Sequence, residues 1–264
     1  MTPIRVVVYG AAGKMGRELV SALCREGGIE VVGAVDVKAG ADYLTLPDTS
    51  GKVPFSSDLE HILTICRPDV LVDFTIVQAT MPAVRLAAKH GVNLVIGTTG
   101  LASNDLAEIR DLALKHKIGA VVAANFALGA VLMMHLAKVA ARYLDYAEII
   151  ELHHNMKADA PSGTAIATAK LMAEARGEPF KRPPVPEPTS SSRGEVVGGV
   201  TIHSVRLPGL LAHQEVILGA LGQTLTIRHD TIGRECYIPG VVVAIKEVVK
   251  RQGLIYGLDT LLNL

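Results

Sequence analysis

The 264-residue chain has no tryptophan, and aromatic residues make up only 4% of it. It also has no excess of charge of either sign, because Lys and Arg together number 26, as do Asp and Glu. A nucleic-acid-binding protein needs a basic surface, and a single-strand binder needs aromatic platforms on which bases stack. The composition therefore argues against a nucleic-acid partner.

Cysteine is equally scarce. The three cysteines, Cys24, Cys66 and Cys236, lie far apart, and none forms a CxxC pair or a cluster with histidines. This spacing predicts neither a metal site nor a disulfide framework. We interpret all three as reduced, buried thiols.

Long apolar runs are missing as well. The most apolar segment, residues 127–141, is interrupted by His135 and Lys138 and is too short to span a bilayer. The N-terminus enters a strand directly, without the basic and then apolar layout of a signal peptide. We therefore expect a cytoplasmic protein with no membrane partner.

What the chain does have is an ordinary globular composition, 49% apolar with 25 glycines, and enough length for two modest domains. A strand over residues 4–9 leads into the glycine-rich loop GAAGKMG (10–16), a helix is expected over 17–26, and the next strand ends at Asp36. This order is typical of dinucleotide binding, since the glycines allow close approach of a pyrophosphate and the acid accepts from the ribose hydroxyls. The spacing is GxxGxxG and not the usual GxGxxG.

Further alternation of strands and helices follows. Strands are expected over 69–74, 93–96 and 118–123, with helices over 78–90 and 104–117 between them. This pattern predicts an α/β fold with a Rossmann-type doubly wound parallel sheet, in which ligands bind beyond the carboxyl ends of the strands.

From about residue 147 the pattern changes. After a long helix expected over 127–145, strand-like segments follow one another with a single helix between them, at 164–176. The expected strands are 148–152, 199–207, 214–221 and 225–229. They predict a second, α+β domain built on an open mixed sheet.

The remaining segments suggest the domain limits. The loop over 177–198 contains five prolines and is too long for a simple connection, so it is either mobile or reaches toward a neighbouring subunit. A helix over 240–251 and an apolar tail are expected to pack on the first domain. We assign residues 1–127 and 238–264 to a dinucleotide-binding domain, and 128–237 to substrate binding and oligomerisation.

The stretch 148–170 carries the candidate chemistry. It delivers His153, His154 and Lys157 to a strand end, just before a Pro-Ser-Gly-Thr turn that opens a helix. Imidazole and amine groups can move protons, and the free N–H groups of a helix start suit a carboxylate. The alternative interpretation is two surface histidines, a solvated lysine and an ordinary capped helix.

Taken together, these motifs resemble the 4-hydroxy-tetrahydrodipicolinate reductase family, also called dihydrodipicolinate reductase, over essentially the whole chain. The resemblance rests on GAAGKMG (10–16), DFT (73–75), GTTG (97–100), AANF (123–126), ELHHNMKADAPSGTA (151–165), GGVTIHSVRLPG (198–209) and HQEV (213–216). It implies NAD(P)H-dependent reduction of 4-hydroxy-tetrahydrodipicolinate to tetrahydrodipicolinate in diaminopimelate and lysine biosynthesis. It also implies a homotetramer assembled through the second domain.

The resemblance also assigns residues by their place in each motif. His153 would be the acid/base residue and Lys157 the proton donor, while His154, Gly163 and Thr164 would bind the dicarboxylate substrate. The nucleotide contacts would be Gly10, Ala11, Ala12, Gly13, Lys14, Met15, Asp36, Gly97, Thr98, Thr99, Ala123, Ala124, Asn125 and Phe126.

One position departs from the pattern of many family members, which carry an Arg directly after the ribose-binding acid. Val37 stands there, with Lys38 and Lys14 nearby as possible substitutes. Because Asp36 favours a free 2′-hydroxyl, we expect NADH to be preferred and NADPH to be used less well.

Two other functions are compatible with a Rossmann-type first domain. An aspartate-semialdehyde type of dehydrogenase needs a nucleophilic cysteine, and none of the three cysteines lies in a credible site. A catalytically inactive nicotinamide-binding sensor of the same fold is the alternative from a different class. Such a sensor would have no reason to keep both histidines, Lys157 and the Ser-Gly-Thr turn.

Overall fold

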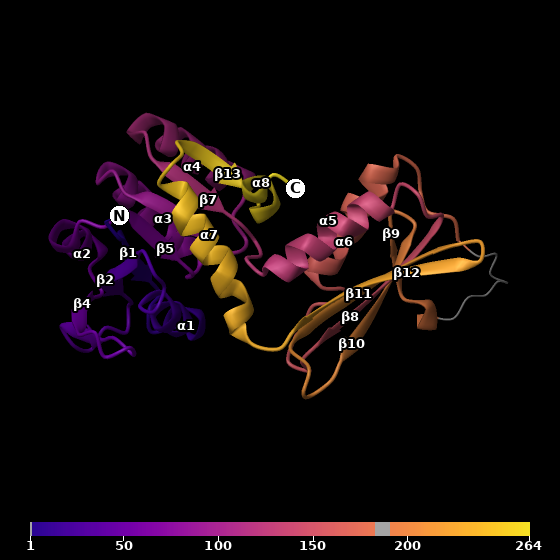
Figure 1. The fold of residues 1–264 in the computed structure, drawn as a ribbon, viewed down its shortest axis with the longest axis horizontal. Coiled ribbons are helices and arrows are strands. Elements are labelled where there is room, and N and C mark those ends of the chain that lie inside the picture. The colour runs from indigo at the N-terminus through magenta and orange to yellow at the C-terminus, as the bar shows by residue number, and fades with distance from the viewer. Residues whose placement is uncertain (1, 183–190) are drawn as a thin grey trace. The chain divides into compact units, whose positions relative to one another are not determined.

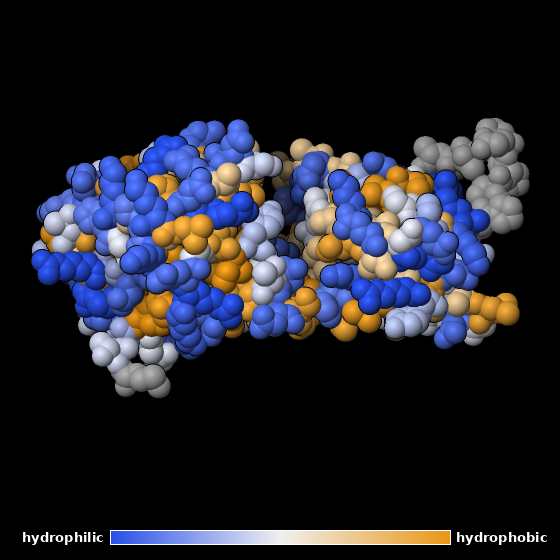
Figure 2. All heavy atoms as spheres, turned by 90° about the horizontal axis from the view of Figure 1, so that it is seen from above, coloured by the Kyte–Doolittle hydropathy of each residue, from blue (hydrophilic) through white to orange (hydrophobic). Residues whose placement is uncertain are grey.

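A computed structural model describes residues 2–182 and 191–264 of the chain. The contacts between Cα atoms divide it into two compact units, Met1–Leu128 with Arg234–Leu264, and Gly129–Gly233 (Figure 1). On the face drawn in Figure 2, hydrophilic side chains cover much of each unit, with smaller hydrophobic patches among them. Within the described ranges, no helix has the length and apolar character needed to cross a membrane.

The first unit is built on an eight-stranded sheet of order β13-β7-β6-β5-β1-β2-β4-β3. Its strands are β1 (Ile4–Tyr9), β2 (Ile29–Val35), β3 (Tyr43–Thr45), β4 (Lys52–Ser56), β5 (Val70–Asp73), β6 (Asn93–Ile96), β7 (Gly119–Val122) and β13 (Gly253–Tyr256). All neighbouring strands are parallel except β3 and β4. The predicted doubly wound sheet is therefore confirmed. Its order reverses between β1 and β5, which is where such sheets bind ligands.

The helices of this unit are α1 (Lys14–Leu23), α2 (Leu59–Cys66), α3 (Val77–Lys89), α4 (Ser103–His116), α7 (Ile238–Val248) and α8 (Leu258–Leu262). A short 3-10 helix, η2 (Arg234–Tyr237), precedes α7. The sequence-based start of α1 at residue 17 was wrong, because the helix begins at Lys14 and includes Gly16. Gly16 allows this early start, since a Cβ there would lie 2.0 Å from the carbonyl oxygen of Gly10.

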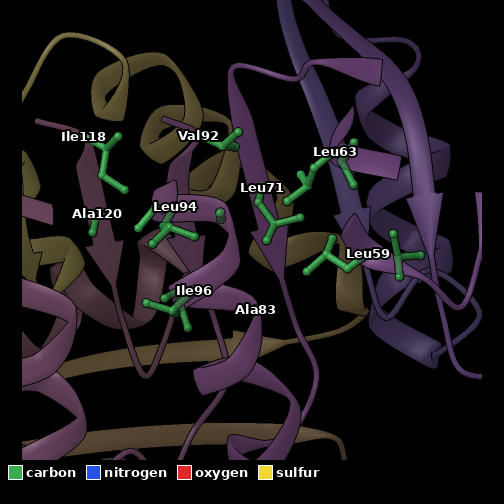
Figure 3. Close-up of a cluster of buried hydrophobic side chains, with 14 of the residues drawn as sticks. Leu59, Leu63, Leu71, Ala83, Val92, Leu94, Ile96, Ile118 and Ala120 are labelled. Atoms are coloured by element: carbon green, nitrogen blue, oxygen red, sulfur yellow. The ribbon is translucent and has the colours of Figure 1, made fainter. Parts of the chain in front are cut away.

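The central strands read as continuous apolar runs because both faces of the sheet are covered. Leu71, Leu94 and Ile96 project from β5 and β6 into a cluster that α2, α3 and α4 close (Figure 3). Burying each such side chain contributes about 1.5–3 kcal/mol relative to leaving it exposed. This cluster keeps the carboxyl ends of the strands in a constant arrangement.

The C-terminal segment completes the same sheet. Strand β13 pairs in parallel with β7, so that Gly253 lies opposite Gly119. Helix α7 lies close to the end of β7, because a Cβ at Gly240 would come within 2.1 Å of the carbonyl oxygen of Phe126. The predicted return of the tail to the first domain is confirmed, although the sequence analysis had not predicted that it forms a strand.

The second unit has a five-stranded sheet of order β12-β11-β8-β10-β9. The strands are β8 (Tyr146–His153), β9 (Glu195–Val197), β10 (Val200–Arg206), β11 (Ala212–Ala220) and β12 (Gln223–Thr231). Strands β8 and β10 are parallel and the other pairs are antiparallel, which confirms the predicted open mixed sheet. Helices α5 (Leu128–Ala140) and α6 (Gly163–Arg176) lie on one face of it (Figure 1). Helix α5 ends five residues before the predicted limit at 145.

The core of the second unit lies between that face and the two helices. Ile149 of β8, Ile202 of β10 and Val216 of β11 point into it and meet Met172 of α6. Every second residue of β8 therefore faces the helices, a periodicity that matters for the site. In the proline-containing loop over 177–198, residues 183–190 lie outside the described residues, and so does the prediction made for them. A short 3-10 helix, η1 (Ser191–Arg193), follows.

Candidate active site

The loop after β1 is held by a carboxylate from the end of β2. Gly10 adopts a positive φ of 85°, which lets the chain turn sharply at the end of the strand. The N–H of Ala12 donates to Oδ2 of Asp36 over 2.9 Å, and the N–H of Lys38 donates to Oδ1 over 2.9 Å. Asp36 thus shapes the glycine loop, a contact that the sequence analysis did not predict.

The start of α1 leaves backbone donors free. Its N-cap residue, Gly13, has no side chain to accept from them. Within the described part of the chain, the N–H groups of Lys14, Met15 and Gly16 have no acceptor. Three free donors at the positive end of a ten-residue helix make a fitting cradle for a phosphate group.

A buried network ties the ends of β5 and β6 together. Asp73 is 1% exposed, and its Oδ1 accepts from the N–H of Thr75 over 2.9 Å and from the Thr75 hydroxyl over 2.6 Å. The hydroxyl of Thr98 accepts from the Thr75 N–H and from Thr80. Burial raises the pKa of Asp73 above its ordinary value, although the hydrogen bonds from Thr75 oppose this shift. Oδ2 of Asp73 has no partner among the described residues.

Aromatic rings close the neighbouring strand ends. The ring centroids of Phe74 and Phe126 lie 5.5 Å apart. Gly97 packs directly on Phe74, since a Cβ at position 97 would come within 2.2 Å of that ring. The predicted nucleotide-contact segments, 10–15, 97–99 and 123–126, therefore follow the carboxyl ends of β1, β6 and β7 in the sheet of the first unit, and Asp36 follows the end of β2.

Not all of these residues present a free side chain. Ala11, Thr98, Ala123 and Phe126 are buried, and the Thr98 hydroxyl is already used in the Asp73 network. Thr99 and Ala124 are exposed.

In the second unit, His153 is the last residue of β8 and faces the helix-covered side of the sheet. Its side chain is 14% exposed, and its Nδ1 lies 2.5 Å from Oε2 of Glu151. Burial lowers the pKa of His153, and the Glu151 carboxylate opposes part of that shift. His154 follows the strand, is exposed, and its ring makes no hydrogen bond to any described residue. The two adjacent histidines therefore stand in different surroundings.

Glu151 is the most enclosed charge of this unit, with a side chain that is 0% exposed. Its two oxygens accept from both terminal nitrogens of Arg206 on β10, over 2.9 Å and 2.8 Å. Burial alone would raise the pKa of Glu151, but hydrogen bonds from Arg206 and its other donors outweigh burial and hold it below its ordinary value. Glu151 is therefore a stable anion inside the protein.

The start of α6 is capped in a way that leaves two donors free. The Ser162 side chain accepts from the N–H of Ala165 over 3.2 Å, and the Ser162 N–H donates to Glu151. The N–H groups of Gly163 and Thr164 find no acceptor among the residues that the structure covers. No atom lies within 4 Å of the Cβ position of Gly163. These two amides are open to an anionic ligand.

Lys157 lies in the turn between β8 and α6. Its Nζ contacts both oxygens of Asp159 at 2.8 Å, and its side chain is 22% exposed. Asp159 is itself exposed, so a carboxylate ligand could replace it as the partner of this cation.

Three residues that the structure places in the candidate site were not predicted from the sequence, namely Asp73, Glu151 and Arg206. Glu151 stands two residues before His153 on a half-buried strand, so the period of two already predicts that both share a face. A charged side chain on a buried strand face is rare, so the same pattern also points to Glu151. Arg206 lies 55 residues away, and its pairing depends on the register of β8 and β10. No cluster of potential metal ligands occurs in the described ranges.

Comparison with known proteins gives consistent matches over the whole chain. Family models described as dihydrodipicolinate reductase, N-terminus and C-terminus, match residues 4–126 and 129–262. A 4-hydroxy-tetrahydrodipicolinate reductase of Dehalococcoides mccartyi is 58% identical over 264 residues, which is 100% of each chain. A reductase of the same name from Moorella thermoacetica is 50% identical and covers 98% of each chain. The solved structure of dipicolinate-bound dihydrodipicolinate reductase from Paenisporosarcina sp. TG-14 matches with a TM-score of 0.87 and 40% identity, covering 98% of this chain and 99% of that one.

Proposed function

Because this chain belongs to the dihydrodipicolinate reductase family, we propose that it catalyses the NAD(P)H-dependent reduction of 4-hydroxy-tetrahydrodipicolinate to tetrahydrodipicolinate, a step of diaminopimelate and lysine biosynthesis. The observation that carries this proposal is the combination of His153 and Lys157 with the two free amides at the start of α6. Nothing in the comparisons supports a catalytically inactive sensor.

The first unit fits a dinucleotide. The free N–H groups of Lys14 and Met15 would hold the pyrophosphate, and Asp36 would meet the adenosine ribose. Residues 97–99 and 123–126, at the ends of β6 and β7, would contact the nicotinamide half. The reduced nicotinamide, when bound, supplies the hydride.

The second unit fits a dianionic substrate. Backbone N–H groups of Gly163 and Thr164 would hold one carboxylate, while His154 and the Lys157 ammonium would lie against the remaining polar groups. In this arrangement a carboxylate of the substrate takes the place of the Asp159 carboxylate beside Lys157.

The proton chemistry falls to His153 and Lys157. Loss of water removes the substrate hydroxyl together with a proton from the neighbouring carbon and leaves a conjugated imine. The hydride then adds to the carbon that carried the hydroxyl, and one proton returns to the neighbouring carbon, so one hydride and one proton are taken up in total. We assign the return of this proton to Lys157 and acid/base exchange to His153, because a positioned ammonium can donate a proton and a positioned imidazole can both accept and release one.

The finer properties follow from the same residues. We propose that NADH is preferred over NADPH, because Asp36 would repel a 2′-phosphate and Val37 offers no positive charge to it. We further propose a homotetramer formed through the second unit, and a cytoplasmic location.

The test is oxidation of NADH or NADPH, followed through the absorbance of the reduced nicotinamide, with the substrate formed in place by a synthase acting on pyruvate and aspartate semialdehyde. Turnover that requires the synthase is expected, and it should be faster with NADH. If both cofactors bind and neither is consumed, the proposed reaction is wrong.

A further inference from the structure

The feature that the proposed chemistry leaves unexplained is the buried carboxylate of Glu151. A wholly buried charge is costly unless it is paired and fully hydrogen-bonded. Glu151 meets this condition with donors from separate parts of the unit. They are the Arg206 guanidinium on β10, the Ser162 N–H before α6, and the His153 ring on its own strand.

We propose that Glu151 is a positioning residue for the reduction. Its carboxylate sets the tautomer and orientation of His153 and, through the Ser162 N–H, fixes the position of the free amides at the start of α6. This inference rests on the proposed function, because it assigns His153 an acid/base role in that reaction. Glu151 does not reach solvent, so it acts through these neighbours and not on the substrate.

The tautomer follows from the hydrogen bonds. Arg206 keeps Glu151 ionised, so both of its oxygens can only accept. The Nδ1 atom of His153, 2.5 Å from Oε2, must therefore carry a hydrogen. Nε2 is then left to take up or release the proton that the reaction moves, as in other enzymes where a buried carboxylate orients a histidine.

The same carboxylate also places the anion-binding amides. Oε1 of Glu151 accepts from the N–H of Ser162 over 3.2 Å, directly before the two free amides of Gly163 and Thr164. One side chain thus joins the proton-transfer group to the carboxylate-binding group. A change at Glu151 should therefore disturb both proton transfer by His153 and carboxylate binding by the α6 amides. A change confined to one of these two groups should leave the other intact.

The charged groups around His153 are few. Glu151 faces it from β8 and Arg206 from β10, while Lys157 lies in the turn that follows. The residue opposite His153 on β11 is Ala212, and the start of α6 contributes only the uncharged Ser162. Asp159 neutralises Lys157 in that turn, and Glu151 is the anion in direct contact with His153, so removal of Glu151 should lower the pKa of His153.

The experiment compares Glu151→Gln with Glu148→Gln. Glu148 lies on the same strand and likewise bonds to a histidine, His203, and an arginine, Arg193, but on the opposite face and in a half-exposed setting. The E151Q variant should lose roughly 10- to 150-fold in kcat, the effect of losing one hydrogen bond to a charged group. The pH profile of kcat should shift to lower pH on the limb that His153 controls. NADH affinity should not change, and E148Q should match the parent in all these measurements.

A direct measurement keeps the inference testable if E151Q does not fold. Nitrogen-15 NMR of labelled histidine in the unmodified enzyme should show hydrogen on Nδ1 of neutral His153. An Nε2–H tautomer overturns the inference, as does E151Q with unchanged kcat and pH profile, or E148Q with the same losses as E151Q. If the unmodified enzyme does not reduce the substrate, the proposed function fails instead, and the NMR result still decides how Glu151 acts.

Discussion

Replacing Gly16 by alanine should weaken dinucleotide binding strongly. A Cβ at position 16 would lie 2.0 Å from the carbonyl oxygen of Gly10 and 2.7 Å from the Cα of Ala11. Cβ atoms essentially never approach other heavy atoms closer than 3.0 Å, so the loop or the helix must move by about 1 Å. That movement takes the free N–H groups of Lys14 and Met15 away from the phosphate position.

The expected size follows from the bonds that are lost. A hydrogen bond to a charged group is worth about 1.5–3 kcal/mol, so loss of one weakens NADH binding roughly 10- to 150-fold. Calorimetric titration with NADH measures it, and circular dichroism checks the fold, since the added methyl can cost about 1–3 kcal/mol of stability. Gly13→Ala, at 3.1 Å from the Gly10 oxygen, should give a smaller loss, and Gly27→Ala, with no atom within 4 Å, should give none. A folded G16A variant with the parent Kd would refute this account of the loop.

Three other perturbations test separate parts of the molecule. Lys157→Ala should lower kcat by about 10²- to 10⁴-fold while the Kd for NADH stays constant, because the ammonium acts on the proton and not on the dinucleotide; unchanged turnover would remove Lys157 from the mechanism. Val37→Arg should raise kcat/KM with NADPH relative to NADH, since the side chain at 37 is 83% exposed beside Asp36 and a guanidinium there can meet a 2′-phosphate; the ratio of the two rates measures it, and no change would count against the assigned role of Asp36. Burial raises the pKa of Asp73 in the folded protein. At pH values between the pKa of Asp73 in the unfolded chain and its pKa in the folded protein, unfolding therefore releases a proton. In that range the free energy of unfolding falls as pH rises, by at most about 1.4 kcal/mol per pH unit. Denaturant titrations from about pH 4 upward should show this slope in the parent and a flatter one in Asp73→Asn; equal slopes would mean that Asp73 is not the group responsible.

The sequence predicted the parallel sheet well because its strands are buried on both faces and so read as apolar runs between helices. It gave no prediction for β3 and β4, because these strands are short and partly exposed and β4 contains Pro54. The start of α1 was also predicted too late. A glycine normally weakens a helix, but the first turn of α1 packs so closely against the loop that only glycine fits at position 16.

The site shows a similar division. Motif spacing alone brought His153, Lys157 and the Ser-Gly-Thr turn into one hypothesis, because all of them lie within a short stretch of chain. Glu151 lies in the same stretch, but its importance depends on a pairing with Arg206 that only the sheet register creates. Likewise, the Asp73 network needs Thr98 from the next strand. Local patterns predict which groups are present, whereas long-range pairing decides which of them are buried and charged.

The position of β13 has a consequence for how the protein is made. During synthesis, the ribosome releases β7 long before residues 253–256 exist, so a nascent chain carries β7 as an open sheet edge while the whole second unit is being translated. The first unit can therefore complete its sheet only after the whole second unit has been translated, and a chain that stops short of residue 253 would expose an edge prone to pair with other chains.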